Sequence, residues 1–383
     1  MAAVLSLIYA FYFASVAVEY VFLPYFFTSH GLSAADIGFL LTGRVIAVTL
    51  LQPRVSALAD ELGRPHLILK LALVAQFIGA LALGYATSFA GFAAVIWIQA
   101  AFRAPIIPVM DSTTVRLAAA DGYGRIRASG SLGFGVCAAV LGQLSGGFDF
   151  AETGDIAIRV YPAIAGLAAV TTLFLPRDSG REKQEHQRVS GFLRGGFLLF
   201  IVWNAMHWTA IAAYNTFFSL YTKELELSPQ VPGLAMGIAI VGEAAAFVLA
   251  PRIFRYGSSS VWVLVSIGAS SLRWVLTAWT EEPALLIALQ ALHFFSFGLW
   301  YAAAIDRIGV FAKPEQRATY QGVFSAGVLS FGSITGSLGG GWLFESVSGS
   351  GMFLAAGVIE AAALTMALAC WRSWTISSVW DAR

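Results

Sequence analysis

Apolar stretches of about 20 residues recur along this chain from its first residues to Trp371. Each is long enough to cross the ~30 Å hydrocarbon core of a bilayer as a helix. Of the 383 residues, 58% are hydrophobic and only 12% are charged, whereas soluble domains carry roughly a quarter charged residues. The stretches lack the alternating pattern of barrel strands, and a helix bonds its own backbone groups in lipid. We therefore predict an all-α, polytopic membrane protein.

Polar residues and clusters of Gly, Pro and Ser divide these stretches into twelve predicted transmembrane helices. The expected ranges are 3–28, 34–58, 65–85, 90–116, 125–147, 156–176, 196–221, 231–253, 259–279, 283–308, 317–343 and 350–372.

Lys and Arg residues gather in alternate loops. With the N-terminus in the cytoplasm, the inner loops receive most of them, whereas the outer loops receive Arg159, Lys223 and several acidic residues. Positive loops stay on the cytoplasmic side, so we predict a multi-pass protein of a bacterial-type inner membrane with both termini cytoplasmic. The net charge of +1 comes without a long basic tract, which argues against a nucleic-acid partner.

Cys137 and Cys370 both fall inside apolar stretches, where they act as small hydrophobic residues. They predict neither a disulfide framework nor a metal site. We expect no cofactor and no metal, and we expect a monomer. The expected partners are the lipid bilayer, a small-molecule solute and a proton.

The longest hydrophilic segment divides the predicted helices into two sets of six. We predict an N-terminal bundle at 1–176, a cytoplasmic linker at 177–195, a C-terminal bundle at 196–373 and a cytoplasmic tail at 374–383. The halves share short patterns: Gly142-Gln-Leu-Ser-Gly-Gly147 is similar to Gly336-Ser-Leu-Gly-Gly-Gly341. Two parallel six-helix repeats around a central cavity are typical of a transporter, although a duplicated bundle of another function would leave the same trace.

Several motifs resemble those of the major facilitator superfamily. The segment Ser56-Ala-Leu-Ala-Asp60-Glu-Leu-Gly63-Arg64, between the second and third predicted helices, is similar to its signature loop, with Ser56 in place of the usual first Gly. By this resemblance, Asp60 and Arg64 form a cytoplasmic gate between the second and eleventh helices. Tyr123-Gly-Arg125-Ile-Arg127 resembles the branch that contains the 3-phenylpropionic acid transporter, lactose permease and the nucleoside proton symporters.

The second half carries further features of the phenylpropionate group. They are Phe217-Phe218-Ser219-Leu220-Tyr221, Glu243, Arg273-Trp274 and Leu292-His293, whereas Tyr301 stands where that group tends to place a second His. The resemblance covers nearly the whole chain and implies the twelve-helix major facilitator fold, with two six-helix pseudo-repeats around a central cavity.

Ionisable residues inside the predicted spans are the main candidates for function, because a charge in the bilayer normally faces a cavity or a partner. Glu19 and Arg44 lie about equally far from the turn at Gly31-Leu32, which places them at similar depth. They can therefore pair. Either Glu19 carries a proton or Arg44 holds a substrate carboxylate, or the two form a permanent salt bridge.

Arg103 and Asp111 lie on the fourth predicted helix, about 12 Å apart along its axis, so each needs another partner. By resemblance to lactose permease, Asp111 lies near an acidic substrate ligand and Arg127 matches a substrate-binding arginine. The alternative for Arg127 is positive-inside anchoring. We treat Asp111 as a candidate for both substrate binding and proton coupling.

The seventh predicted helix has a polar and aromatic face. Asn204, His207 and Tyr214 recur at helical spacing with Asn215 beside them, and such a face is unfavourable in lipid. We expect it to face the central cavity opposite Tyr12 and its neighbours on the first helix. The alternative for His207 is a satisfied hydrogen bond between helices.

The tenth predicted helix repeats this pattern with His293, Phe297 and Trp300, a spacing that suits stacking on a planar solute, although ordinary helix packing is the alternative. Glu243 in the eighth helix is predicted at a depth near that of His207. We expect Glu243 to be a proton-coupling group, with Glu19 and Asp111 as rivals, or a structural partner of Arg273.

These features predict a secondary active transporter and not an enzyme. We expect a proton symporter that carries a small organic solute by alternating access, and no phosphate-binding Gly-x-x-x-x-Gly-Lys-Ser/Thr motif is present for direct ATP drive. Arginines beside aromatic faces favour an aromatic or other monocarboxylate. The alternatives are a neutral sugar or nucleoside bound through Asp111, Asn204 and Asn215, proton-driven efflux, and a membrane enzyme or sensor of the same fold.

Overall fold

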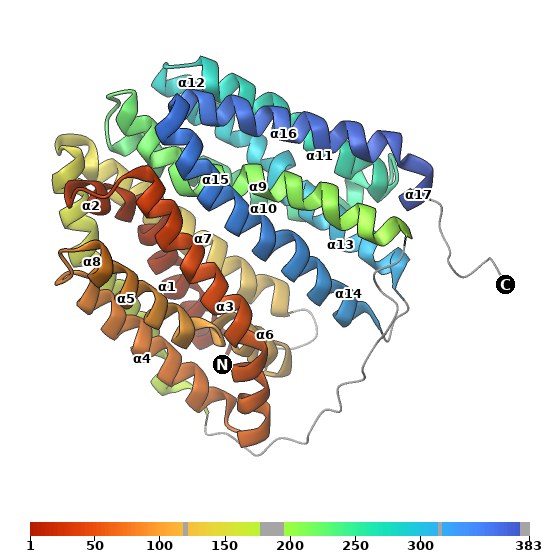
Figure 1. The fold of residues 1–383 in the computed structure, drawn as a ribbon. Coiled ribbons are helices and arrows are strands. Elements are labelled where there is room, and N and C mark those ends of the chain that lie inside the picture. Colours follow the sequence, from red (N-terminus) through yellow and green to blue (C-terminus); the bar gives the residue numbers. More distant parts are fainter. Residues whose placement is uncertain (118–121, 177–194, 313–315, 376–383) are drawn as a thin grey trace. The chain divides into compact units, whose positions relative to one another are not determined.

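The computed structural model describes residues 1–117, 122–176, 195–312 and 316–375, without the side chains of Ser56, Ala57, Ala59, Asp60 and Ala318. The part described is built from helices (Figure 1). Within these described ranges, twelve helical segments are long and apolar enough to cross a membrane, which confirms the predicted number of spans. Most of the predicted linker, 177–194, and the end of the tail, 376–383, lie outside the described residues.

The first six spans comprise the following elements. They are α1 (Ala2–Val21) with α2 (Leu23–Ser29), α3 (Ala34–Leu62), α4 (Pro65–Leu83), α5 (Phe89–Arg103) with α6 (Ile106–Leu117), α7 (Gly122–Leu144) with η1 (Ser145–Gly147), and α8 (Phe150–Thr171) with η2 (Thr172–Phe174).

The next six spans follow in the same manner. They are α9 (Gly195–Glu224), α10 (Gln230–Ile253), α11 (Ser259–Trp279), α12 (Pro283–Leu289) with η3 (Gln290–Leu292), η4 (Phe294–Leu299) and α13 (Trp300–Phe311), then α14 (Arg317–Phe324) with η6 (Ser325–Ser330) and α15 (Phe331–Val347), and finally α16 (Gly349–Ala369), which α17 (Trp371–Thr375) follows.

Several predicted boundaries were wrong by three or more residues, and two of them have a clear physical reason. The sixth span begins at Phe150 and not at 156, because Asp149 caps the helix and forms a reciprocal capping box with Glu152. The segment of the signature loop from Ser56 to Leu62 is helical and belongs to α3; the chain turns only at Gly63, which has a φ of 59°. Hydrophobicity alone did not show how far these helices extend into polar sequence.

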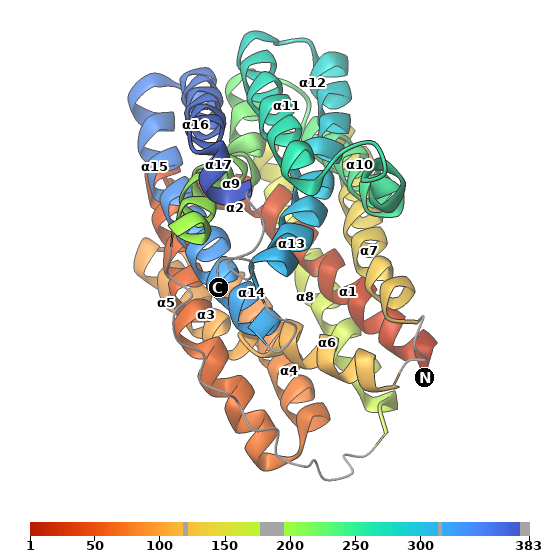
Figure 2. The same ribbon diagram turned by 90° about the vertical axis from the view of Figure 1, so that its right-hand side faces the viewer.

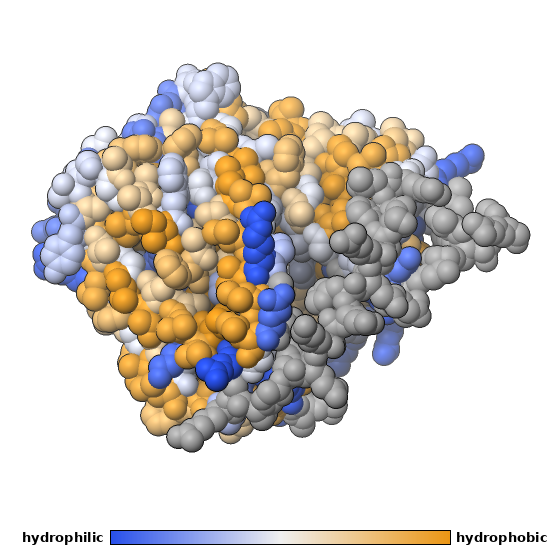
Figure 3. Space-filling model, turned by 60° about the horizontal axis from the view of Figure 1, so that its bottom comes forward, coloured by the Kyte–Doolittle hydropathy of each residue, from blue (hydrophilic) through white to orange (hydrophobic). Residues whose placement is uncertain are grey.

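The outward faces of the helices carry large apolar side chains. Leu71, Ile78, Val136 and Val241 are each more than half exposed, and Figure 3 shows apolar residues over much of the face that it presents. In water such a surface would be unfavourable, whereas in lipid it has no cost. The chain is a multi-pass membrane protein.

The chain divides into two compact units. Unit 1 consists of Met1–Glu185 and Phe218–Ile240; unit 2 consists of His186–Phe217 and Val241–Arg383. In unit 1, α1 packs against α7 and α8, and α4 packs against α5 and α8. In unit 2, α11 packs against α16 and α13, and α15 packs against α16 (Figure 2).

Glycines allow close contacts between helices in each unit. A Cβ added at Gly133 in α7 would overlap the carbonyl oxygen of Ala10 in α1, and one added at Gly336 in α15 would overlap that of Thr209 in α9. At these positions the absence of a side chain lets the backbones of two helices approach closely.

Candidate functional site

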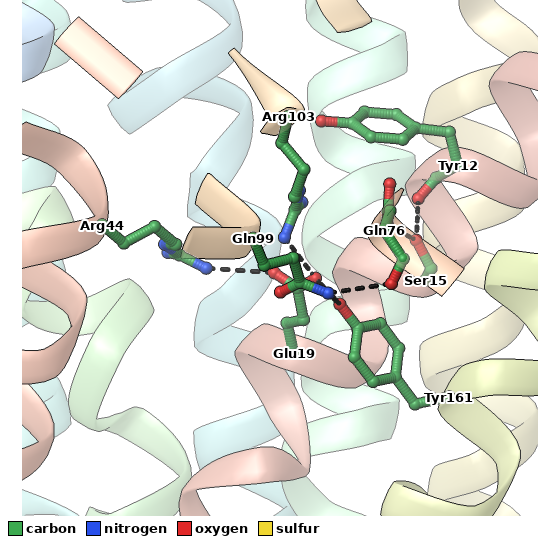
Figure 4. A network of polar contacts seen from close by, with 8 residues as sticks. All are labelled: Tyr12, Ser15, Glu19, Arg44, Gln76, Gln99, Arg103 and Tyr161. Atoms are coloured by element: carbon green, nitrogen blue, oxygen red, sulfur yellow. Dashed lines mark hydrogen bonds and ion pairs between the residues drawn. The ribbon is translucent and has the colours of Figure 1, made fainter. Parts of the chain in front are cut away.

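A buried carboxylate in unit 1 joins three helices. Glu19 of α1 accepts hydrogen bonds from Nη1 of Arg44 in α3 at 3.0 Å and from Nη1 of Arg103 in α5 at 2.5 Å (Figure 4). The three side chains are 6%, 14% and 9% exposed, respectively. The predicted pairing of Glu19 with Arg44 is confirmed, and Arg103 finds its partner in the same carboxylate.

The cluster extends through a chain of neutral polar groups. The hydroxyl of Tyr161 in α8 donates to Glu19, and Nε2 of Gln99 bonds the same hydroxyl at 3.2 Å. Gln76 donates to Ser15 at 2.7 Å, and Ser15 donates to the carbonyl oxygen of Tyr12. The ring of Tyr12 lies 5.8 Å from the Arg103 guanidinium, which favours the cation. Tyr161, Gln99 and Gln76 were not among the predicted site residues.

The hydrogen bonds indicate that Glu19 is ionised. A guanidinium can only donate, and Tyr161, which accepts from Gln99, directs its own proton to Glu19. The donors therefore support the salt-bridge alternative for Glu19. Because two guanidinium groups share one carboxylate, the group retains a net charge of +1.

A small cavity lies beside this cluster. Its volume of about 20 Å³ is roughly the space that one water molecule needs. Its lining residues are Glu19, Leu23, Phe27, Leu41, Arg44, Leu83, Ile96, Gln99, Arg103 and Tyr161.

A second charged group in unit 1 is more exposed. Nε of Arg127 in α7 lies 3.8 Å from Oδ1 of Asp111 in α6, and the two side chains are 35% and 32% exposed. The hydroxyl of Tyr9 donates to the same oxygen. The Arg127 guanidinium lies 4.5 Å from the centre of the Phe13 ring. The structure thus brings together Asp111 and Arg127, both predicted as site residues, beside aromatic rings of α1.

The predicted cavity face of the seventh span is packed inside unit 2. Nδ1 of His207 lies 2.7 Å from Oε2 of Glu360 in α16, and Nε2 lies 3.0 Å from the carbonyl oxygen of Ser296. His207 and Glu360 are fully buried. The expectation that His207 faces a cavity is therefore corrected: it forms the satisfied bond between helices that was its alternative.

Its neighbours on α9 follow the same pattern. Asn204 accepts a hydrogen bond from Trp300 at 2.8 Å and donates to the carbonyl oxygen of Phe200. Tyr214 is fully buried, with its ring 5.1 Å from that of Trp274. Asn215 is half-buried. The polar stripe of α9 is polar because it meets polar partners in neighbouring helices of unit 2.

A second polar group in unit 2 connects three ionisable side chains. Nη1 of Arg273 in α11 donates to Nδ1 of His293 at 3.1 Å and to the hydroxyl of Ser296 at 2.6 Å, while Nη2 donates to Gln290. Nε2 of His293 lies 3.8 Å from the carboxylate of Glu243 in α10. His293 thus lies between Arg273 and Glu243, which had been predicted as possible direct partners.

Aromatic rings continue from His293 along the same span. The rings of His293 and Phe297 are stacked with centres 5.4 Å apart, and those of Phe297 and Tyr301 are stacked at 5.8 Å. The segment Phe294–Leu299 is a π-helix, a local irregularity that often occurs at functional sites. Trp300 packs in the core of unit 2, with the centre of its ring 4.5 Å from that of His207.

The predicted cytoplasmic gate is described only in part. Arg64 is exposed at the N-cap of α4, whereas the side chain of Asp60 lies outside the described residues. Among the described residues, no group of three or more His, Cys, Asp or Glu side chains is arranged to hold a metal ion.

Glu360 is the principal buried acidic residue that the sequence reasoning missed. It is the single acidic residue within the predicted span 350–372, so the cost of a charge in lipid would have identified it. It also accepts hydrogen bonds from Ser270 at 2.6 Å and from Trp274 at 3.1 Å.

The chain is similar in sequence to proteins that are named as transporters. The chain is 25% identical over 372 residues to the "probable 3-phenylpropionic acid transporter" of Escherichia coli (strain K12), covering 91% of this chain and 92% of the relative. It is 28% identical over 322 residues to the maltose permease of Geobacillus stearothermophilus, covering 82% and 80% of the two chains.

Solved structures agree on the fold. A mutant form of the nucleoside transporter NupG matches with a TM-score of 0.85 at 18% identity, covering 98% of this chain and 100% of that chain. The family model described as "MFS_1 like family" matches residues 2–355. The chain therefore belongs to the MFS_1 like family of the major facilitator superfamily, and it is a transporter of that type.

Proposed function

We propose that this transporter carries a small aromatic or other monocarboxylate together with a proton, by alternating access. The observation that supports it most is that Arg44 and Arg103 share the single carboxylate of Glu19. A buried net charge of +1 is costly unless a counter-ion neutralises it. A solute carboxylate supplies one negative charge, which balances the group.

The carboxylate end of the solute has suitable donors in unit 1. Each guanidinium has five N–H groups, and the contacts to Glu19 use Nη1 of each arginine. The adjacent water-sized space suits one carboxylate oxygen in place of a water. We propose Arg44, Arg103 and Tyr12 as the ligands of this end, with Arg127 as a second anion-binding group beside Phe13 and Tyr9.

The predicted ligands in unit 2 have different proposed roles. Asn204, His207 and Trp300 hold helices together, and Tyr214 packs against Trp274, so we propose that they support the fold of the unit. Asn215 and His293 remain candidate solute ligands.

We propose Glu243 as the principal proton-coupling residue. The guanidinium of Arg273 contains no acceptor atom, so it must donate to Nδ1 of His293. The Nδ1 atom therefore carries no proton. The proton of neutral His293 is then on Nε2, which faces Glu243 at 3.8 Å. The remaining group that can gain or lose a proton in this set is the Glu243 carboxyl. Asp111, which is one-third exposed, is the rival.

The test is uptake into proteoliposomes under an imposed proton gradient, with and without a protonophore. The panel contains 3-phenylpropionate, maltose and uridine, and it compares the wild type with Arg103→Gln, Asp111→Asn and Glu243→Gln. We expect uptake of the carboxylate, its loss in Arg103→Gln, and its sensitivity to the protonophore. A carboxylate that neither enters nor competes would exclude our first choice of solute.

A neutral sugar or nucleoside is the second candidate, because the relatives include a maltose permease and a nucleoside transporter. Uptake of maltose or uridine that Arg103→Gln leaves intact would favour it. Efflux is tested with the same solutes in everted membrane vesicles. In these vesicles a solute that the cell exports by proton-driven efflux is taken up.

We further propose the oligomeric state, the membrane location and the orientation in which the chain acts. The chain acts as a monomer in a bacterial inner membrane, with both termini in the cytoplasm and with halves at 1–176 and 196–373 that alternate access. Asp60 and Arg64 gate the cytoplasmic side. Cysteine accessibility at Arg64 and at the outer residue Glu281 tests the orientation, since only one of the two sites faces the cytoplasm.

A further inference from the structure

The contacts of His207 and Glu360 determine how many protons the pair holds. The carbonyl oxygen of Ser296, 3.0 Å from Nε2 of His207, can only accept a hydrogen bond. Nε2 must therefore carry a hydrogen. The other ring nitrogen, Nδ1, lies 2.7 Å from Oε2 of Glu360, which is the distance of a charge-assisted hydrogen bond.

That short contact requires one further proton. If Nδ1 and Oε2 both lacked a hydrogen, two lone pairs would face each other at 2.7 Å in a fully buried site. The proton is on Nδ1 if the pair is imidazolium and carboxylate, or on Oε2 if it is imidazole and carboxylic acid. In both cases the pair as a whole is neutral and holds one shared proton.

The remaining carboxylate oxygen is already occupied. Oε1 of Glu360 accepts from the hydroxyl of Ser270 at 2.6 Å and from Nε1 of Trp274 at 3.1 Å. His207, Ser270, Trp274 and Glu360 are all buried without solvent exposure. Water therefore does not reach either atom that shares the proton.

We propose that His207 and Glu360 form a proton-binding site that keeps its proton throughout the transport cycle and holds α9, α11, η4 and α16 together. The pair itself joins α9 to α16, α11 contributes two contacts through Ser270 and Trp274, and η4 contributes one through Ser296. This site is separate from the proposed coupling residue Glu243, and the proposal does not depend on which solute is carried.

The charged and titratable neighbours support retention of the proton. Arg273 of α11 lies within electrostatic range of Glu360, and its positive charge opposes a second proton on the pair. Its Nη1 and Nη2 groups donate to Gln290, Ser296 and His293, so they do not replace the proton between His207 and Glu360. Tyr214 of α9 contacts Arg273, and Glu243 of α10 faces His293.

Three variants test this proton count. In Glu360→Gln, the amide N–H can donate to Nδ1 of neutral His207, and the amide oxygen can accept from Ser270 and Trp274. We expect its thermal unfolding midpoint and its proton-driven uptake of 3-phenylpropionate to match those of the wild type. Glu282→Gln, at an exposed residue, is the control for the same chemical change.

His207→Gln leaves Glu360 buried without the imidazole that shares its proton, so no cation neutralises the carboxylate when it is ionised. It also leaves the Ser296 carbonyl without its donor. We expect its unfolding midpoint to fall by about 5–10 °C. Adding Glu360→Gln removes the buried charge, so we expect the double variant to recover part of this loss. A double variant no more stable than His207→Gln would contradict the proposal.

Nitrogen-15 NMR of the histidine side chains measures the protonation of the ring nitrogens directly in the wild type. The His207→Gln variant is used to assign the signal of His207. We expect the His207 nitrogen shifts to stay constant between about pH 5 and pH 9, a range in which an ordinary histidine titrates. A titration in this range would overturn the proposal. A Glu360→Gln variant that fails to fold would also overturn the proposal. So would one that keeps solute exchange but loses accumulation of the solute against a gradient. If no carboxylate is transported, the unfolding and NMR results still decide the question.

Discussion

Removing the Glu19 carboxylate should lower the stability of the protein more than removing one of the two arginines that bind it. In Glu19→Gln, Arg44 and Arg103 remain as two buried cations without their shared carboxylate. At separations of 3.0 and 2.5 Å, an effective dielectric constant of about 20 gives an attraction of roughly 6 kcal/mol for each contact. Much of this offsets desolvation, and removal of one partner from a buried ion pair typically costs about 3–5 kcal/mol. We expect a loss of stability of that size.

Arg103→Gln has the opposite charge balance. It leaves Glu19 with Arg44 and the Tyr161 hydroxyl, so the group becomes neutral, and the main loss is one charged hydrogen bond, about 1.5–3 kcal/mol. Anion binding, by contrast, should be weakened strongly. Stability and function are therefore predicted to separate: Glu19→Gln is the less stable variant, whereas Arg103→Gln loses uptake while it remains folded.

The double variant Glu19→Gln/Arg103→Gln makes this a test of charge and not of shape. It carries one buried cation in place of two, so its unfolding midpoint should lie above that of Glu19→Gln. Thermal unfolding of the purified proteins in detergent measures the order, and Glu281→Gln, at an exposed residue, is the control. A double variant as unstable as Glu19→Gln, or a Glu19→Gln protein as stable as the wild type, would refute the reasoning.

Three further predictions use the same assays. Gly133→Ala should lower stability by about 1–3 kcal/mol through overlap with Ala10, whereas Gly124→Ala in the same helix, where an added Cβ meets nothing within 4 Å, should gain up to about 1 kcal/mol of helix propensity; equal midpoints would contradict the packing argument. Glu243→Gln should abolish accumulation against a gradient and keep solute exchange, and a variant that still accumulates solute would exclude it as the coupling residue. Arg127→Lys should raise the KM for 3-phenylpropionate severalfold with little change in stability, because its side chain is one-third exposed; an unchanged KM would remove it from the proposed ligands.

The pairing of Glu19 with Arg44 followed from the sequence because it depends on depth alone. Both residues lie at similar distances from one short turn, and the rise of a helix converts those distances into depth. The partner of Arg103 did not follow, since α5 meets α1 only through tertiary packing. Sequence distance along one span contains no information about which neighbour a residue faces.

The polar face of α9 shows a second limit of sequence reasoning. Helical spacing correctly grouped Asn204, His207 and Tyr214 on one side, away from lipid. A side that avoids lipid can face either a cavity or polar partners in other helices, and periodicity does not distinguish the two. Here the partners include Trp300 and Glu360. Glu360 lies 153 residues away in the sequence, so the periodicity of α9 could not identify it as the partner of His207.

The geometry of four acids separates structural carboxylates from those that can exchange a proton. Glu19 and Glu360 are 6% and 0% exposed and are each bonded by three side chains. Release or uptake of a proton there would break several contacts between helices.

Asp111 and Glu243, at 32% and 13% exposed, are the more accessible of these four acids. A coupling group must meet water during the cycle, since the proton comes from solution and returns to it. Exposure therefore favours Asp111 or Glu243 for the proposed coupling, and structural roles for Glu19 and Glu360. An amide substitution at either structural acid that preserved exchange but abolished accumulation would reverse this assignment.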